Sequence, residues 1–245
     1  MKRLPLPCIP LYLALSASVS NASINIVLDY GATSAADVVT YGAAFNAAET
    51  FWESNLSGYR DGLLAPTSVI MNVALGNIDG AGGTLGSAGP TQVNIQGNFL
   101  ETTQGNMTFD TSDLGSSVSA GTFEAVIRHE MAHVLGFGSL WSSSAVGLPG
   151  YQEVYVNGSG QYTGAFGLAA FQQEFDQADA TYVPIELDGA AGTANGHWNM
   201  GIDLGAEFEA VDSRDDPGDT IVYTSVFNGK VLDNELMTGF LSGDA

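Results

Sequence analysis

Apolar residues recur along the first half of the chain with spacings that predict its secondary structure. Apolar side chains between 38 and 52 recur three or four positions apart, as on one face of an α-helix, so we expect a helix over 35–56 that Ser34 caps. Short apolar, β-prone runs at 24–29 and 67–75 predict two buried strands. The helical positions that we expect in the core are Val38, Tyr41, Phe45, Ala48 and Trp52.

A glycine-rich stretch then interrupts the apolar pattern. Residues 77–90 contain too many glycines for a regular central strand, so we expect a loop that leads to the edge of a sheet. Beyond that loop, 91–95 and 106–110 have the composition of short strands. Strand structure is therefore expected to resume only after Pro90.

A second helix is expected over 123–135, because the residues at both of its ends favour it. Thr122 is a suitable N-cap, Glu124 places a negative charge in the first turn, and Gly136 can end the helix in a left-handed turn. After this helix the pattern is irregular from 139 to 196. The elements expected there are a strand at 153–156, a turn at 157–158 and a short helix over 168–175.

The composition is that of a folded and strongly acidic protein. The chain has 245 residues, a hydrophobic fraction of 45% and no clear linker, which suits one domain with a substantial core. There are 27 acidic residues against 6 basic ones, for a formal net charge of -21. A surface of this sign repels nucleic acid and anionic membranes, so neither is expected as a partner. It attracts cations, including calcium, although solubility alone is a sufficient reason for the charge.

The first 22 residues are typical of a secretory signal peptide. A positively charged start is followed by an apolar stretch over 4–17 and by small residues up to Ala22. This stretch is too short for a permanent membrane anchor, so we expect cleavage after Ala22 and a secreted or periplasmic protein. The one cysteine, Cys8, would be removed with the signal, which leaves a mature chain without disulfides.

Two of the three histidines lie in the sequence His129-Glu130-Met131-Ala132-His133, within the expected second helix. Positions four apart share one face of a helix, so both imidazoles can bind one metal ion, with Glu130 beside them as a candidate general base. A catalytic zinc ion needs a third protein ligand and an open position for water. His197 is the one histidine that remains to supply that ligand. The alternative is a surface helix with two unrelated histidines.

Further motifs accompany this helix. Residues 129–136 carry the glycine of the metzincin pattern HExxHxxGxxH, which would place its third histidine at Ser139, a poor zinc ligand. The chain instead offers His197-Trp198 and, 40 residues after His197, Met237 within Glu235-Leu236-Met237-Thr238-Gly239. This combination resembles the leishmanolysin-like metallopeptidases of the metzincin clan, in which the third histidine follows a long insertion. The segments 79–91, 183–186 and 192–194 are similar to bacterial members too.

The resemblance implies a fold and a set of roles. The implied fold is an α+β, metzincin-like zincin, with one catalytic domain over 23–245. Its N-terminal subdomain, about 23–138, would hold a twisted mixed sheet and two long helices, one with the HExxH motif. Its irregular C-terminal subdomain, about 139–245, would hold a methionine turn. The family roles match His129, His133 and His197 to the zinc ligands, Glu130 to the catalytic base and Met237 to an apolar floor below the metal.

The implied function is that of a secreted, monomeric zinc endopeptidase acting on proteins or peptides. Zinc lowers the pKa of a bound water, and Glu130 would accept the proton of that water. In metzincins, an edge strand before the active-site helix pairs with the extended substrate. The residues matched to that strand, and so to substrate binding, are Thr84, Leu85, Gly86, Ser87 and Ala88.

Two other functions remain open at this point. One is a zincin hydrolase that acts on a substrate other than protein. The other is a non-catalytic, zinc-stabilised extracellular binding module, although such a site would not need Glu130 and would usually fill its fourth position with a Cys or His. The segment 212–219 adds a cluster of acidic residues between His197 and Met237. Its carboxylates suit a calcium ion, but a solvated acidic loop is the simpler interpretation.

Overall fold

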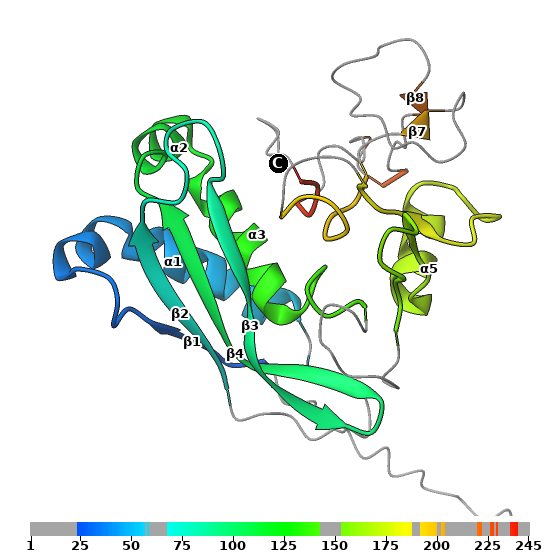
Figure 1. Ribbon diagram of the computed structural model, residues 1–245, viewed down its shortest axis with the longest axis horizontal. Helices are drawn as coiled ribbons and strands as arrows, with labels where there is room; N and C mark the ends of the chain where they lie inside the picture. The colour runs from blue at the N-terminus through cyan, green and yellow to red at the C-terminus, as the bar shows by residue number, and fades with distance from the viewer. Residues whose placement is uncertain are drawn as a thin grey trace, which may run out of the picture.

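The computed structural model describes most of the first half of the chain and several segments of the second half (Figure 1). The described residues are 24–56, 58, 68–142, 153–187, 192–199, 202–203, 220–221, 226–227, 229 and 236–239. The expected signal peptide at 1–22 and the acidic segment 212–219 both lie outside these ranges.

A mixed four-stranded sheet forms the centre of the structure, with the strand order β1-β2-β4-β3 (Figure 1). Strands β1 (Ile26–Asp29), β2 (Val69–Gly76) and β4 (Phe99–Asp110) run parallel to one another. Strand β3 (Gly86–Gln96) pairs with β4 in the antiparallel direction and lies at the edge of the sheet. The α+β class is thereby confirmed.

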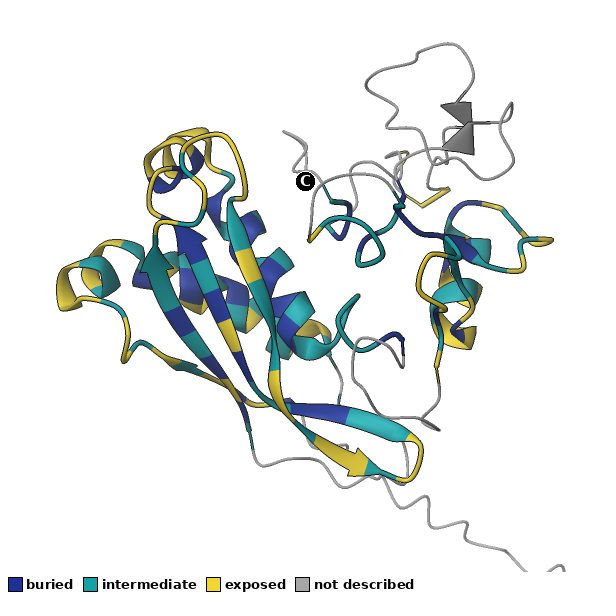
Figure 2. Ribbon diagram, in the orientation of Figure 1, coloured by how far each residue is buried: buried dark blue, intermediate teal, exposed yellow. Residues whose placement is uncertain are grey.

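Two long helices cover one face of this sheet and form the core with it (Figures 1 and 2). Helix α1 (Ala35–Asn55) and helix α3 (Phe123–Leu135) lie side by side, joined by a hydrogen bond of 3.0 Å from Trp52 Nε1 to the Arg128 carbonyl oxygen. The rings of Phe45, Phe109 and Phe123 meet edge to face in the centre, with centroids 5.3 to 5.8 Å apart. The other fully buried side chains around them include Met71, Met107, Ile127, Met131 and Val134.

The remaining elements are short. Helix α2 (Leu114–Ala120) precedes α3, and helix α5 (Ala165–Glu174) lies in the second half. The described second half also contains two small antiparallel pairs, β5 (Gln161–Tyr162) with β6 (Val183–Pro184) and β7 (Ile202–Asp203) with β8 (Thr220–Ile221). In the described part of the chain, no helix has the length and apolar character needed to cross a membrane.

Both long helices lie where the sequence predicts them, the first from its apolar spacing and the second from the residues at its ends. Ser34 caps α1 through its side chain, which accepts a hydrogen bond of 3.2 Å from the Asp37 amide, and Gly136 ends α3 with a φ of 113°. Phe45 and Ala48 are buried, and Tyr41 and Trp52 pack against the same core, whereas Val38 is only half-buried.

Three expectations about local structure are wrong. Thr122 makes no side-chain cap, because its hydroxyl faces the Ser117 carbonyl oxygen at the end of the preceding helix. The loop expected over 77–90 ends earlier, since β3 already begins at Gly86. Glycine and proline are tolerated there because the strand is at an edge. The strand expected at 153–156 is reduced to one bridge, between Tyr155 and Tyr162.

Two shorter elements also differ from the sequence expectations. The helix expected over 168–175 begins three residues earlier, at Ala165, and ends at Glu174. Helix α2 was not expected, because its sequence of small and polar residues has only two buried positions, Leu114 and Ser117. The turn expected at 157–158 is present.

A buried carboxylate shapes the glycine-rich loop before β3. Asp110, at the end of β4, accepts hydrogen bonds of 2.9, 2.9 and 3.0 Å from the backbone amides of Ile78, Asp79 and Gly80. Its other oxygen accepts the Ser112 amide at 2.7 Å. These donors hold the pKa of Asp110 well below its usual range, because they favour the ionised form. The loop is thus folded around one negative charge.

The contact between the sheet and helix α3 requires a glycine at position 105. A Cβ atom there would lie 2.5 Å from Val134 Cγ1 and 2.7 Å from the Gly89 carbonyl oxygen, both too close. Gly105→Ala should therefore lower the free energy of unfolding by about 1–3 kcal/mol, as overpacked cores do. Gly89→Ala is the matched control on the neighbouring strand, because nothing lies within 4 Å of a Cβ atom there. Chemical denaturation of both variants checks this, and equal stability of the two would contradict it.

Candidate metal centre

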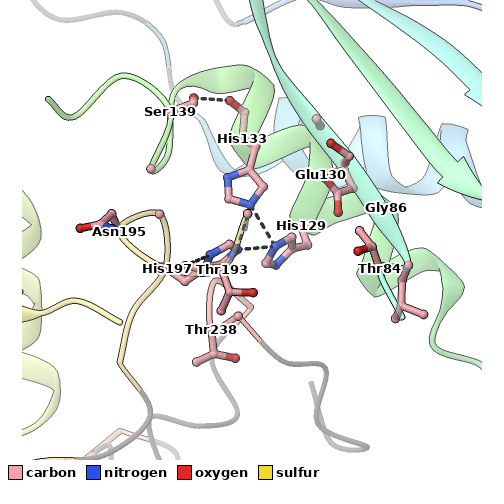
Figure 3. Close-up of a pocket in the computed structure, with 18 of the residues that line it drawn as sticks. Thr84, Gly86, His129, Glu130, His133, Ser139, Thr193, Asn195, His197 and Thr238 are labelled. Carbon is pink, nitrogen blue, oxygen red and sulfur yellow. Dashed lines mark hydrogen bonds between the residues drawn. The ribbon is translucent and has the colours of Figure 1, made fainter. Parts of the chain in front are cut away.

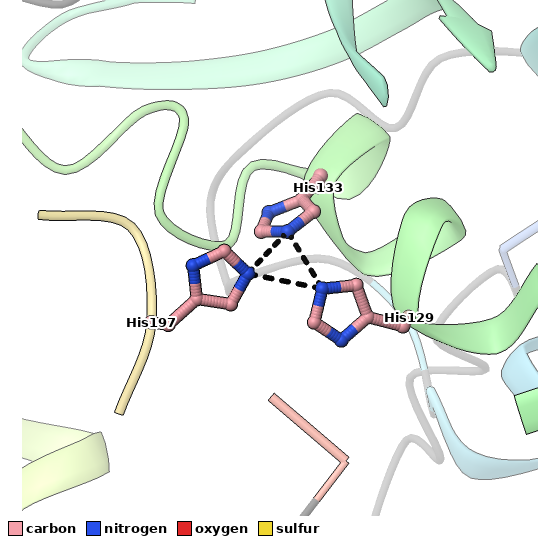
Figure 4. A group of neighbouring side chains, drawn as sticks. All are labelled: His129, His133 and His197. Carbon is pink, nitrogen blue, oxygen red and sulfur yellow. Dashed lines mark hydrogen bonds between the residues drawn. The ribbon is translucent and has the colours of Figure 1, made fainter. Parts of the chain in front are cut away.

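All three histidines of the chain meet at one point. His129 and His133 project from helix α3, and His197 arrives from the segment 192–199 (Figure 4). The three Nε2 atoms form a triangle in which every side is 3.0 Å. His197 follows His133 by 64 positions and His129 by 68 positions in the sequence, and it is thereby brought into contact with both.

The second ring nitrogen of each histidine faces a backbone carbonyl oxygen. His129 Nδ1 lies 2.7 Å from the Leu236 oxygen, His133 Nδ1 lies 2.9 Å from the Phe137 oxygen, and His197 Nδ1 lies 2.8 Å from the Thr193 oxygen. A carbonyl oxygen only accepts hydrogen bonds, so each neutral ring must carry its proton on Nδ1. Each Nε2 atom then directs a lone pair at the other two, and three acceptors cannot bond to one another. A cation satisfies all three at once.

Burial keeps these imidazoles in the neutral form that binds metals. It lowers the pKa of His129 to about 3, with a further contribution from the positive charge that His133 and His197 would carry. Burial also lowers the pKa of His197 to about 4, and repulsion from a charged His133 adds to this shift. Burial lowers the pKa of His133 as well. At neutral pH the three lone pairs are therefore available without loss of a proton.

The donor set fits a zinc ion. Tetrahedral zinc with bonds of about 2.0–2.1 Å sets its ligand nitrogens about 3.3 Å apart, close to the 3.0 Å sides of this triangle. Three imidazoles are also the ligand set of known catalytic zinc sites that leave a fourth position open. No other group of three or more His, Cys, Asp or Glu in the described residues is arranged to hold a metal ion.

His197, the third histidine of the cluster, is held in place by backbone pairing and by aromatic packing. The Glu186 amide donates to the His197 carbonyl oxygen at 3.0 Å, and the Asn195 amide donates to the Glu186 carbonyl oxygen at 2.7 Å. The next residue, Trp198, stacks on Trp141 with ring centroids 5.1 Å apart and meets Phe137 edge to face at 4.8 Å. The segment that carries His197 is therefore packed against the chain that leaves helix α3.

Asn195 and Tyr155 contribute to this arrangement although the sequence did not point to them. The Tyr155 hydroxyl donates to Asn195 Oδ1 at 2.6 Å, and the Gly158 amide donates to the same oxygen at 2.8 Å. Asn195 has a φ of 68°, a conformation that asparagine tolerates better than most residues. An asparagine two residues before a ligand histidine is a weak signal by itself, because its role depends on contacts distant in sequence.

The segment 236–239 reaches the site through its backbone. The Leu236 carbonyl oxygen accepts from His129, and the Met237 carbonyl oxygen accepts the Trp198 amide at 3.0 Å. Met237 is buried, with 6% of its surface exposed, but it is not among the residues that line the cavity. The part of this segment that contacts the histidine cluster is thus the Leu236 carbonyl oxygen. The role of Met237 as an apolar floor below the metal stays a prediction.

Glu130 lies next to the histidines in a cavity of about 750 Å³ (Figure 3). Only 5% of its surface is exposed, and this burial raises the pKa of its carboxyl to about 8. A cation bound by the adjacent histidines would lower that pKa, because it favours the ionised carboxylate. The carboxyl group can therefore exchange a proton close to neutral pH.

The residues matched to substrate binding line the same cavity, namely Thr84, Leu85, Gly86, Ser87 and Ala88. The Thr84 hydroxyl donates to Asp79 at 2.8 Å, so this side chain is already engaged within the glycine-rich loop. Ser139 also lines the cavity, but its hydroxyl donates to the His133 carbonyl oxygen at 2.6 Å. Ser139 is thus bonded to the end of helix α3, and the third member of the cluster is His197.

No protein-family model matches the chain, and no curated protein matches it either. The geometry alone therefore carries the interpretation, and it supports a buried cluster of three histidines compatible with a zincin-like site.

Replacement of the third ligand should abolish tight metal binding. His197→Ala removes one of the three nitrogen atoms that would bind the metal. Loss of a residue that only hydrogen-bonds to a metal ligand costs roughly 10–100-fold in affinity, so the loss of zinc affinity here should be larger than that. Ser139→Ala is the matched control, because Ser139 occupies the position that a shorter metzincin motif would use. Zinc titration of the metal-free variants measures both. Loss of zinc from the Ser139 variant with retention by the His197 variant would reverse the assignment.

A close approach of two glycines should matter for metal binding as well. A Cβ atom on Gly138 would lie 2.2 Å from the carbonyl oxygen of Gly196, the residue before His197. Gly138→Ala should therefore displace His197 and weaken zinc binding by about 10–100-fold. Gly121→Ala controls for backbone strain, because Gly121 has a φ of 77° and Gly138 has a φ of 68°. A Cβ atom on Gly121 would meet nothing within 4 Å. Equal zinc affinities of the two variants would contradict this role.

Proposed function

We propose that this protein is a zinc-dependent endopeptidase of the leishmanolysin-like type. One observation carries the proposal: three inward-facing imidazole lone pairs and a buried glutamate share one cavity with the start of an edge strand. The sequence combination of HExxH, His197-Trp198 and the segment 235–239 supports the more specific family assignment.

The chemistry divides between the metal and the chain. Zinc bound at this site would polarise a water molecule and the substrate carbonyl. His129, His133 and His197 would hold the ion, and their Nδ1 bonds to backbone oxygens fix the ring orientations. Glu130 accepts a proton from the attacking water and then donates it to the departing amine. A carboxyl with a pKa of about 8 in the metal-free site, lowered by a cation, is suited to both transfers.

The position of β3 at the edge of the sheet favours a polypeptide as the substrate. Its one partner among the described strands is β4, so its other side presents backbone donors and acceptors to an additional strand. An extended peptide that pairs there would pass close to Glu130, because Gly86 to Ala88 line the cavity. Small side chains on this stretch let a substrate backbone approach closely. This feature favours peptides over a non-protein substrate.

We also propose that the protein is exported and acts as a monomer on extracellular or periplasmic proteins. The signal-like composition of residues 1–22 and the formal charge of -21 support this location. A purely structural role for the metal is disfavoured, because it would not require a buried carboxyl group beside the ligands.

Replacement of the proposed base should separate metal binding from catalysis. Glu130→Gln keeps the size of the side chain but cannot accept a proton, so casein cleavage should fall by about 10²–10⁴-fold. Bound zinc should stay at one ion per chain. Glu124→Gln is the control on the same helix, because Glu124 pairs with Arg128 and does not line the cavity. Equal cleavage by the Glu130 variant and the unaltered protein, or no cleavage by the zinc-loaded unaltered protein, would refute the proposal.

A further inference from the structure

Glu130 occupies the space that a side chain at position 86 would need. A Cβ atom on Gly86 would lie 2.7 Å from Glu130 Oε1, 2.8 Å from its Cγ and 2.9 Å from its Cδ. These separations are well below van der Waals contact. Figure 3 shows Glu130 beside the strand that carries Gly86. The absence of a side chain at 86 is thus a condition for the present position of the carboxyl group.

Neither partner in this contact can move away easily. The clash includes Cγ as well as the carboxyl group, so rotation of the end of the Glu130 side chain would not relieve it. On the other side, Gly86 pairs with Phe109 of β4, and the Asp110 amide holds the neighbouring Leu85 carbonyl oxygen at 3.0 Å.

The requirement for glycine at 86 is one of space and not of backbone conformation. Gly86 does not have a positive φ, so any residue could adopt its backbone angles. Gly89, on the same strand, also lacks a positive φ, but a Cβ atom there would meet nothing within 4 Å. The two glycines therefore differ in what lies opposite them.

We propose that Gly86 is a positioning residue for Glu130. The edge strand that would bind the substrate thereby also determines the position of the Glu130 carboxyl group between β3 and α3. Gly86 itself takes no part in the chemistry. The catalytic consequence rests on the proposed peptidase function, whereas the steric relation between the two residues can be tested without any activity.

A double-mutant cycle on the zinc-loaded protein tests the steric relation. Gly86→Ala should lower the folding equilibrium constant by about 10-fold or more, as overpacking does. In a Glu130→Ala background the obstructing side chain is gone, so the same change should cost less than about twofold. Gly89→Ala should cost the same small amount in both backgrounds. Should Gly86→Ala alone fail to fold, recovery of folding in the double variant would support the relation equally well.

Kinetics and metal binding test the catalytic consequence. Gly86→Ala should reduce kcat for casein-derived peptides by about 10²-fold through displacement of Glu130, with KM and zinc affinity unchanged within about twofold. Gly115→Ala in helix α2 is the control for kinetics, because Gly115 lies outside the cavity with nothing within 4 Å of a Cβ atom, and it should leave all three unchanged.

The outcomes separate this proposal from the proposed function. Equal stability costs of Gly86→Ala in both backgrounds, or failure of the single and the double variant alike to fold, would overturn the positioning role. A large rise in KM at unchanged kcat would overturn it as well. Stability coupling in a zinc-loaded protein that cleaves no peptide would support the position of Glu130 while refuting the peptidase function.

Discussion

The site depends on the way three imidazole rings are each fixed by a backbone carbonyl oxygen. Because Leu236, Phe137 and Thr193 accept from the Nδ1 atoms, the Nε2 lone pairs all point to one centre, 3.0 Å from each other. A cation bound at this centre would satisfy all three acceptors at once, and it would then contribute to the stability of the fold as well as to the proposed chemistry.

The carbonyl oxygens come from three separate parts of the chain, so a metal ion bound by the three histidines would connect these parts. One lies just after helix α3, one in the segment before His197 and one in the turn at 236–239. The sheet supplies the fourth component, since β3 borders Glu130 at Gly86. Helix, edge strand and two loops therefore meet at a single cavity, and a displacement of any one of them would change the position of a histidine or of Glu130.

The features of this site that depend on local sequence could be predicted, and those that depend on distant contacts could not. The spacing of His129 and His133 and the glycine at 136 predict the helix and its two clustered histidines from sequence alone. The start of β3 at Gly86 could not be predicted, because glycine-rich composition indicates a loop and only pairing with β4 makes it a strand. The Tyr155–Asn195 hydrogen bond and the role of Asp110 are invisible in sequence for the same reason.

The most direct test of the metal centre is zinc titration of the metal-free protein combined with X-ray absorption spectroscopy of the product. One zinc ion per chain, bound to three imidazole nitrogens at about 2.0–2.1 Å with one further light-atom ligand, is the expected result. Binding with fewer than three imidazoles in the coordination shell, or no stoichiometric binding of zinc, would contradict the convergence of His129, His133 and His197 on one ion.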